Sequence, residues 1–277
     1  MKTSRSKSFR GFFICRGEGN LMRLNSSDSG CKGLFSGFFF LFFCLCVSGN
    51  SYAAHPLISD DAGTVGTGNF ELEVNVEYAN DNGDSETQLA ATLSAGIREN
   101  IDLVAGVPYL FTGIDDGAET LKEDGLSDIT FELKWRFYEK DGLSFAIKPG
   151  IFIPTGEEDK GLGDGKAAYG IHFLATKELD PLTLDFDLGY IRNREELRDI
   201  WHYSLAAEYA VSKPLTLVAD IGGETNPDRE SNVHPLFLLG GLIYKIKENF
   251  SVDFGLKTGL NRAEADYTVL AGIIADF

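Results

Sequence analysis

From residue 69 to its end, the chain alternates hydrophobic and polar residues with a period of two. The clearest run starts at Phe70 and reads Phe-Glu-Leu-Glu-Val-Asn-Val-Glu-Tyr. Successive side chains of a β-strand point to opposite faces, so this pattern predicts strands with one apolar and one polar face. Twelve such segments are present. They span 69–80, 86–98, 101–112, 127–139, 142–154, 167–178, 181–192, 199–211, 214–223, 233–246, 249–260 and 265–277.

The last segment ends the chain on an aromatic residue, and Tyr267, Ile273 and Phe277 share its apolar face. A half-apolar strand at the C-terminal end is typical of the closing strand of an outer-membrane β-barrel, with its apolar face toward lipid. In that class of protein a terminal Phe serves as an insertion signal. We therefore expect the barrel-insertion machinery to bind Phe277.

The connections between segments alternate in length. Short turns lie at 98–100, 139–142, 179–181, 212–214 and 247–249, and longer Gly- and acid-rich stretches lie at 113–126, 155–166, 193–198, 224–232 and 261–264. Bacterial barrels place short turns in the periplasm and long loops outside. The sequence thus predicts one domain over 69–277, an all-β transmembrane antiparallel up-and-down β-barrel of about 12 strands, with no separate plug.

The N-terminal region has the pattern of a secretory signal peptide. Lys32 precedes the apolar run 38–47, and Ser-Tyr-Ala ends at Ala53. A basic residue, a short apolar run and a small-x-small site predict cleavage there, although an N-terminal membrane anchor is the alternative. We assign 1–53 to the signal peptide, with Met22 as a plausible true start, and 54–68 to a periplasmic segment. The expected location is the outer membrane of a Gram-negative bacterium.

Processing would also change the composition. All four cysteines precede residue 54, as do seven of the 25 basic and two of the 42 acidic residues, which leaves 18 bases and 40 acids. A chain without cysteine forms no disulfide, and such an acidic chain lacks the basic face that nucleic acid requires. We expect outer-membrane lipid and lipopolysaccharide as partners, with acidic loops bridged to them by divalent ions.

Polar residues on the predicted inward faces are the candidates for lining a pore. Lys134, Arg136 and Lys148 come from adjacent strands and are expected to form a basic stripe opposite acidic residues. Opposed charges across a lumen would orient a small polar solute, or would pair and fill a narrow interior. The pore-lining candidates are Glu71, Glu73, Glu77, Arg98, Glu132, Lys134, Arg136, Lys148, Asp185, Asp187 and Lys257. The candidates for an extracellular gate are Pro154, Thr155, Gly156, Glu157, Glu158 and Asp159.

Catalytic and metal sites are not predicted. His202 and Ser204 share one face of a strand, but residues two apart are separated by about 6.5–7 Å, beyond the reach of a nucleophile–base pair. The histidines show no recognisable metal-ligand spacing. We expect no enzyme activity, no cofactor and no bound metal.

Several short motifs resemble a family of outer-membrane transporters labelled for the meta-pathway of phenol degradation. They are His55 to Thr64 running on to 68–73, Gly125-Leu126-Ser127-Asp128 leading to Lys134, and Pro154-Thr155-Gly156 followed by 161–163. The resemblance covers most of the predicted mature chain. It implies a barrel and the passage of small, often aromatic or hydrophobic molecules, and it transfers no catalytic residue.

The sequence therefore favours an outer-membrane channel for passive passage of small solutes. The alternative is a closed structural or surface-interaction barrel whose acidic loops bind divalent ions. A lipid-modifying barrel enzyme would require a Ser–His pair in contact.

Overall fold

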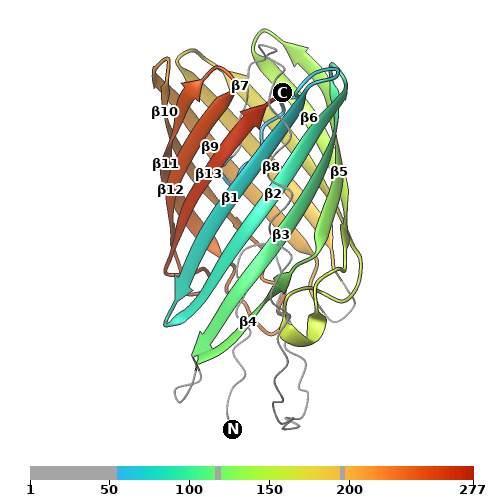
Figure 1. Ribbon diagram of the computed structural model, residues 1–277, viewed down its shortest axis with the longest axis vertical. Helices are drawn as coiled ribbons and strands as arrows, with labels where there is room; N and C mark the ends of the chain where they lie inside the picture. Colours follow the sequence, from blue (N-terminus) through green and yellow to red (C-terminus); the bar gives the residue numbers. More distant parts are fainter. Residues whose placement is uncertain (1–54, 116–119, 194–196) are drawn as a thin grey trace, which may run out of the picture.

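The computed structural model describes residues 55–115, 120–193 and 197–277, and within them the chain forms a closed antiparallel β-barrel (Figure 1). The predicted signal peptide lies outside the described residues. The strands are β1 (Phe70–Asp81), β2 (Asp84–Arg98), β3 (Ile101–Asp115), β4 (Thr120–Leu126), β5 (Ile129–Lys140), β6 (Leu143–Ile153), β7 (Ala168–Glu178), β8 (Leu182–Arg192), β9 (Ile200–Ser212), β10 (Leu215–Glu224), β11 (Leu236–Lys247), β12 (Phe250–Gly259) and β13 (Tyr267–Asp276).

Neighbouring strands pair in sequence order, and β1 pairs with β13 to close the barrel. The seam continues to the end of the chain, because Phe70 and Phe277 exchange backbone hydrogen bonds of 3.0 and 2.8 Å. Closure pairs both edges of the strands around the ring, as the interior of a membrane demands, and β4 alone has one paired edge among the described strands. The all-β antiparallel barrel expected from the sequence is confirmed.

Strands β4 and β5 act as one strand of the wall. Strand β3 pairs with β5 over 101–106 and with β4 over 109–115, so the barrel has twelve strand positions. The sequence predicts a loop over 113–126, and this expectation is wrong because 120–126 forms β4, which pairs with β3 over 109–115 while β2 pairs with the other edge of β3 up to Gly113. Strand β4 carries polar residues on both faces, which is compatible with its nearly complete exposure.

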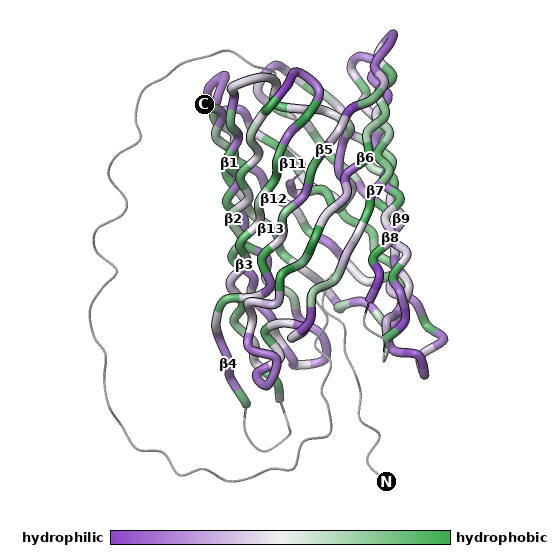
Figure 2. The backbone as a smooth tube through the Cα atoms, turned by 90° about the vertical axis from the view of Figure 1, so that its right-hand side faces the viewer, coloured by the Kyte–Doolittle hydropathy of each residue, from purple (hydrophilic) through white to green (hydrophobic). Residues whose placement is uncertain are grey.

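The side-chain alternation has the predicted phase. Phe131, Leu133 and Trp135 are exposed on the outer face of β5, whereas Lys134 is buried on its inner face. Figure 2 shows hydrophobic and hydrophilic residues alternating along the strands. Among the described residues, no helix is long and apolar enough to cross a membrane, and the single short 3-10 helix η1 spans Glu158–Lys160.

Candidate functional site

The N-terminal segment 55–68 lies inside the barrel and crosses the lumen. Its first described residue, His55, bonds through Nδ1 to Asp253 on β12. Further along, Ala62 N donates to Thr176 Oγ1 on β7 (2.9 Å), and Val65 N donates to Asp102 Oδ2 on β3 (3.0 Å). The segment thus spans from one side of the wall to the other, and we call it the lumen segment.

Two lysines of the wall hold the lumen segment at Asp60. Lys134 Nζ on β5 donates to Asp60 Oδ1 over 2.8 Å, and Lys148 Nζ on β6 donates to Asp60 Oδ2 over 2.6 Å. All three side chains are at most 16% exposed. Burial raises the pKa of the Asp60 carboxyl, but the two ammonium groups outweigh it and hold that pKa well below its usual range.

An acidic residue of the wall holds the neighbouring residues. The backbone N–H groups of Ile58 and Ser59 both donate to Asp220 Oδ2 over 2.7 Å. The Ser59 Oγ lies 3.0 Å from Asp220 Oδ1 and 2.8 Å from Ser204 Oγ, and its single proton is donated to one of these two oxygens at a time. Backbone amides thereby stabilise a carboxylate that is 1% exposed. The barrel provides hydrogen-bond partners for an extended peptide that has no strand of its own.

Apolar contacts complete the fit of the lumen segment. Leu57 is buried in a cluster of inward-facing side chains, and Ala62 packs with Ala146 of β6 and Leu174 of β7. The members of the Leu57 cluster are Ala206, Val218, Phe237, Leu239, Ile243 and Leu270. The inner wall therefore combines charged groups with apolar patches, and each meets a matching residue of the segment.

A glycine-rich turn brings the lumen segment to the rim. Gly66 and Gly68 have φ values of +81° and +79°, a left-handed conformation that favours glycine. Gly68 N donates to Gly96 O over 2.9 Å, and a Cβ added at Gly96 would lie 1.8 Å from Gly66 O. Only glycine at position 96 allows the chain to pass this close to β2.

The predicted basic stripe is divided between two places. Lys134 and Lys148 meet at Asp60, while Arg136 lies near the rim and contacts Glu139 (3.2 Å). Arg98 is exposed at the end of β2. The other pore-lining candidates, Glu71, Glu73, Glu77, Glu132, Asp185, Asp187 and Lys257, are buried or half-buried on inward faces. Their role in a pathway remains a prediction.

The gate candidates lie in a loop that is fixed at its base. Asp128, at the break between β4 and β5, accepts bonds from Gly156 N (3.0 Å) and Asp164 N (2.9 Å), and Thr155 Oγ1 donates to Ser127 O (2.7 Å). We call residues 154–166 the anchored loop. The remaining candidates, Pro154, Glu157, Glu158 and Asp159, are exposed. The described hydrogen bonds between the anchored loop and the rest of the chain go to the adjacent wall, and none goes to the lumen segment.

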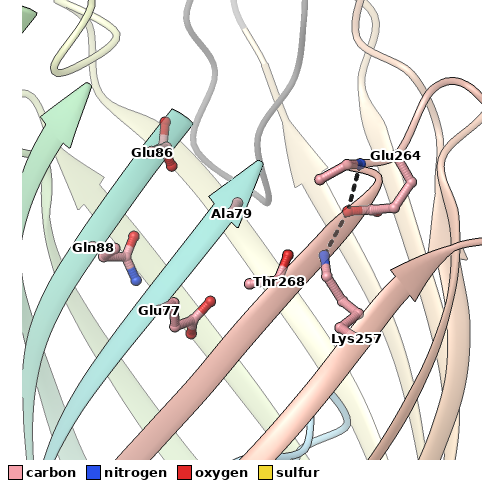
Figure 3. A pocket seen from close by; sticks show the side chains of 8 residues that line it. Glu77, Ala79, Glu86, Gln88, Lys257, Glu264 and Thr268 are labelled. Atoms are coloured by element: carbon pink, nitrogen blue, oxygen red, sulfur yellow. Dashed lines mark hydrogen bonds and ion pairs between the residues drawn. The ribbon is translucent and has the colours of Figure 1, made fainter. Parts of the chain in front are cut away.

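A small pocket lies between β1, β2, β12 and β13, near the long-loop end. Figure 3 shows Lys257 extending toward Glu264, with their Nζ and Oε1 atoms 2.5 Å apart, and Glu77 and Glu86 on neighbouring strands. In the described part of the chain, no group of three or more His, Asp or Glu residues has an arrangement that could hold a metal ion.

The distance argument against a Ser–His pair is wrong. His202 Nε2 lies 3.1 Å from Ser204 Oγ, because the imidazole extends along the strand and covers the separation of the two backbones. However, the nearest oxygen of Asp187 lies 4.0 Å from the same Nε2 atom. A Ser-His-Asp triad needs the serine and the carboxylate on opposite ring nitrogens, so Asp187 does not serve as the third member of one.

The lumen segment is the feature that sequence reasoning missed. Its charged or hydroxyl-bearing residues 59–61, 64 and 67 read as a solvated lead-in, and no periodicity marks an extended peptide held inside a barrel. One signal was present: two lysines on adjacent inward faces, with Glu132 as the nearest acid on the same face of these two strands, favour a further anion between them. The acids of 54–68 were the candidates for that anion.

Comparisons with known proteins agree with this architecture. The model of the family described as “Putative MetA-pathway of phenol degradation” matches residues 53–277. A COG4313 outer-membrane channel from Pseudomonas putida F1 has a similar structure, with a TM-score of 0.62 at 12% identity, covering 78% of this chain and 98% of its own. The porin NanC gives a TM-score of 0.54 at 11% identity, covering 73% and 98%, and the porin KdgM gives 0.53 at 9%, covering 75% and 99%. No curated protein matches the chain.

Proposed function

The chain belongs to the family described as “Putative MetA-pathway of phenol degradation”, and we propose that it is an outer-membrane channel for the passive passage of small, often aromatic or hydrophobic, solutes. One observation carries the proposal: the lumen holds an extended segment of the chain itself. Barrels of about eight strands are filled by their own wall side chains. A barrel that holds a peptide has the cross-section for a small solute once that peptide moves.

The location and partners follow from the same barrel. The apolar outer face fits outer-membrane lipid, and the acidic long loops fit lipopolysaccharide bridged by divalent ions. Phe277 lies at the seam that closes the barrel, where it bonds to Phe70. That position supports its role as the residue that the insertion machinery recognises. The proposal includes no enzyme activity, and the solved structures similar to this barrel are channels and porins.

A second candidate function is a closed structural barrel. The observation that favours it is the number of strands that contact the lumen segment, which include β3, β5, β6, β7, β9, β10 and β12. In that case the lumen segment would be a permanent part of the core. The two functions differ in whether the segment leaves its place.

A reversible cross-link separates the two functions. Ser59 Oγ and Ser204 Oγ are 2.8 Å apart, and residues 54–277 contain no cysteine, so Ser59→Cys with Ser204→Cys can form a disulfide between segment and wall. We expect conductance in planar bilayers when the double variant is reduced, and its loss on oxidation. The single variants should not respond to redox conditions. Silence of folded, reduced protein would favour the structural barrel, and equal conductance in both states would place the segment outside the path.

A further inference from the structure

The search for a ligand site leads to the pair of lysines behind Asp60. Lys134 and Lys148 project inward from the neighbouring strands β5 and β6. Two ammonium groups side by side repel each other, and burial strengthens the repulsion unless an anion lies between them. The wall therefore has a preformed place for an anion.

The Asp60 carboxylate occupies this place, and its geometry indicates which kind of anion fits there. Each oxygen of the Asp60 carboxylate faces a different lysine, at 2.8 and 2.6 Å. The other nearby acids are less well placed: Asp61, also on the lumen segment, is 3.9 Å from Lys134, and Glu132 of the wall is 3.5 Å from Lys148. When residues 60 and 61 leave, Glu132 is the one carboxylate that remains within 4.0 Å of either lysine in the described part of the chain, so two ammonium groups face a single close anion.

An apolar surface lies next to the two lysines. Ala146 is two residues from Lys148 on the same face of β6, and it forms a buried cluster with Leu174 and with Ala62 of the lumen segment. Residues two apart on a strand are separated by about 6.5–7 Å. The lumen segment thus places a carboxylate on the lysines and a methyl group on the adjacent apolar pair, as a small organic acid would.

We propose that Lys134 and Lys148 form a binding site for small organic monocarboxylates with an apolar body, and that Asp60 occupies this site when no solute is bound. The proposal rests on the proposed channel function and narrows its solute class. A carboxylate solute would compete with Asp60 and favour release of the lumen segment. Neutral aromatic molecules of the same size would not compete.

Equilibrium dialysis of radiolabelled benzoate against the purified full chain in detergent tests the proposal. We expect Asp60→Ala to bind one benzoate per barrel at least ten-fold more tightly than the unchanged protein, because the competing carboxylate is gone. Adding Lys148→Met should remove that gain. Benzyl alcohol, which lacks the carboxylate, should bind equally weakly to all three proteins. Asp60→Asn, which keeps the side-chain size, serves where Asp60→Ala does not fold.

Glu86→Gln is the matched control, since it replaces one inward carboxyl group that lines the pocket beside Lys257 and has no described contact with Lys134 or Lys148. An equal gain in benzoate affinity in Glu86→Gln would show that overall charge causes the effect. An equal gain in benzyl alcohol affinity in Asp60→Ala would show that the space left by the side chain causes it. Either result, or unchanged benzoate binding in folded Asp60 variants, overturns the proposal. Binding is measured in detergent without a membrane, so its result does not depend on whether the barrel conducts. Failure of the carboxylate site and failure of the channel function are therefore distinguishable.

Discussion

The lumen segment and the anchored loop are both polar and rich in glycine, yet the barrel uses them in different ways. The lumen segment gives its carboxylate at Asp60 to two buried lysines of the wall. The anchored loop donates backbone N–H groups to a carboxylate from beside the wall, Asp128, and its own acids Glu157, Glu158 and Asp159 are exposed. Segments of similar composition are thus fixed by opposite arrangements of charge, and only the first lies where a solute would pass.

The largest difference is expected between the two lysine–carboxylate pairs of these regions. Lys148→Met removes one partner of the buried Asp60, and breaking such a pair costs about 3–5 kcal/mol. Native-state hydrogen exchange at Ile58 and Ser59 should show a lower opening free energy by that amount. Lys160→Met, in the exposed pair with Glu157, should change nothing measurable. Similar effects from both substitutions would contradict the expectation that the buried pair is stronger than the exposed one.

A smaller effect is expected where the wall carboxylate holds the anchored loop. Asp128→Ala leaves the N–H groups of Gly156 and Asp164 without their acceptor, at a cost of about 2 kcal/mol of loop stability. Faster exchange of these two amides and cleavage of the loop by trypsin after Lys160 would report it. Asp128→Asn keeps one acceptor oxygen and should lose less. Loosening of Asp60 in the same variant would show that the two regions are coupled.

The smallest effect concerns the hydroxyl of Ser59. Ser59→Ala removes its bonds to Asp220 and Ser204, but the backbone bond from Ser59 N to Asp220 remains. A hydrogen bond contributes about 1 kcal/mol, so the opening free energy at residue 59 should fall by about that value. An effect as large as that of Lys148→Met would mean that hydroxyl groups, rather than charges, hold the lumen segment.

The pattern of β5 shows how much of the wall is local information. Phe131, Leu133 and Trp135 face outward and Lys134 faces inward because the side chains of a strand alternate with a period of two. Lipid favours apolar side chains on the outer face, and the lumen favours polar ones on the inner face. The hairpin of β3 and β4 shows the limit. Nearly all of β4 is exposed and both of its faces carry polar residues, so polarity does not distinguish this strand from a loop, and only the pairing of β4 with β3 decides it.

The candidate site divides in the same way. Wall residues such as Lys134 and Lys148 are identified from their inward phase along the strand. The contact of Ser204 with His202 is not predicted by the distance between their backbones, because the length and orientation of the imidazole side chain determine it.

The sequence by itself determined the barrel, its closure at the C-terminal strand and the charged inner face, since these depend on the two-residue period of each strand. The tertiary structure alone decided that residues 55–68 cross the lumen and that Asp60 lies between two lysines. Those contacts join residues 74 and 88 positions apart, and their energy exists only after the barrel has closed and excluded water from the charges.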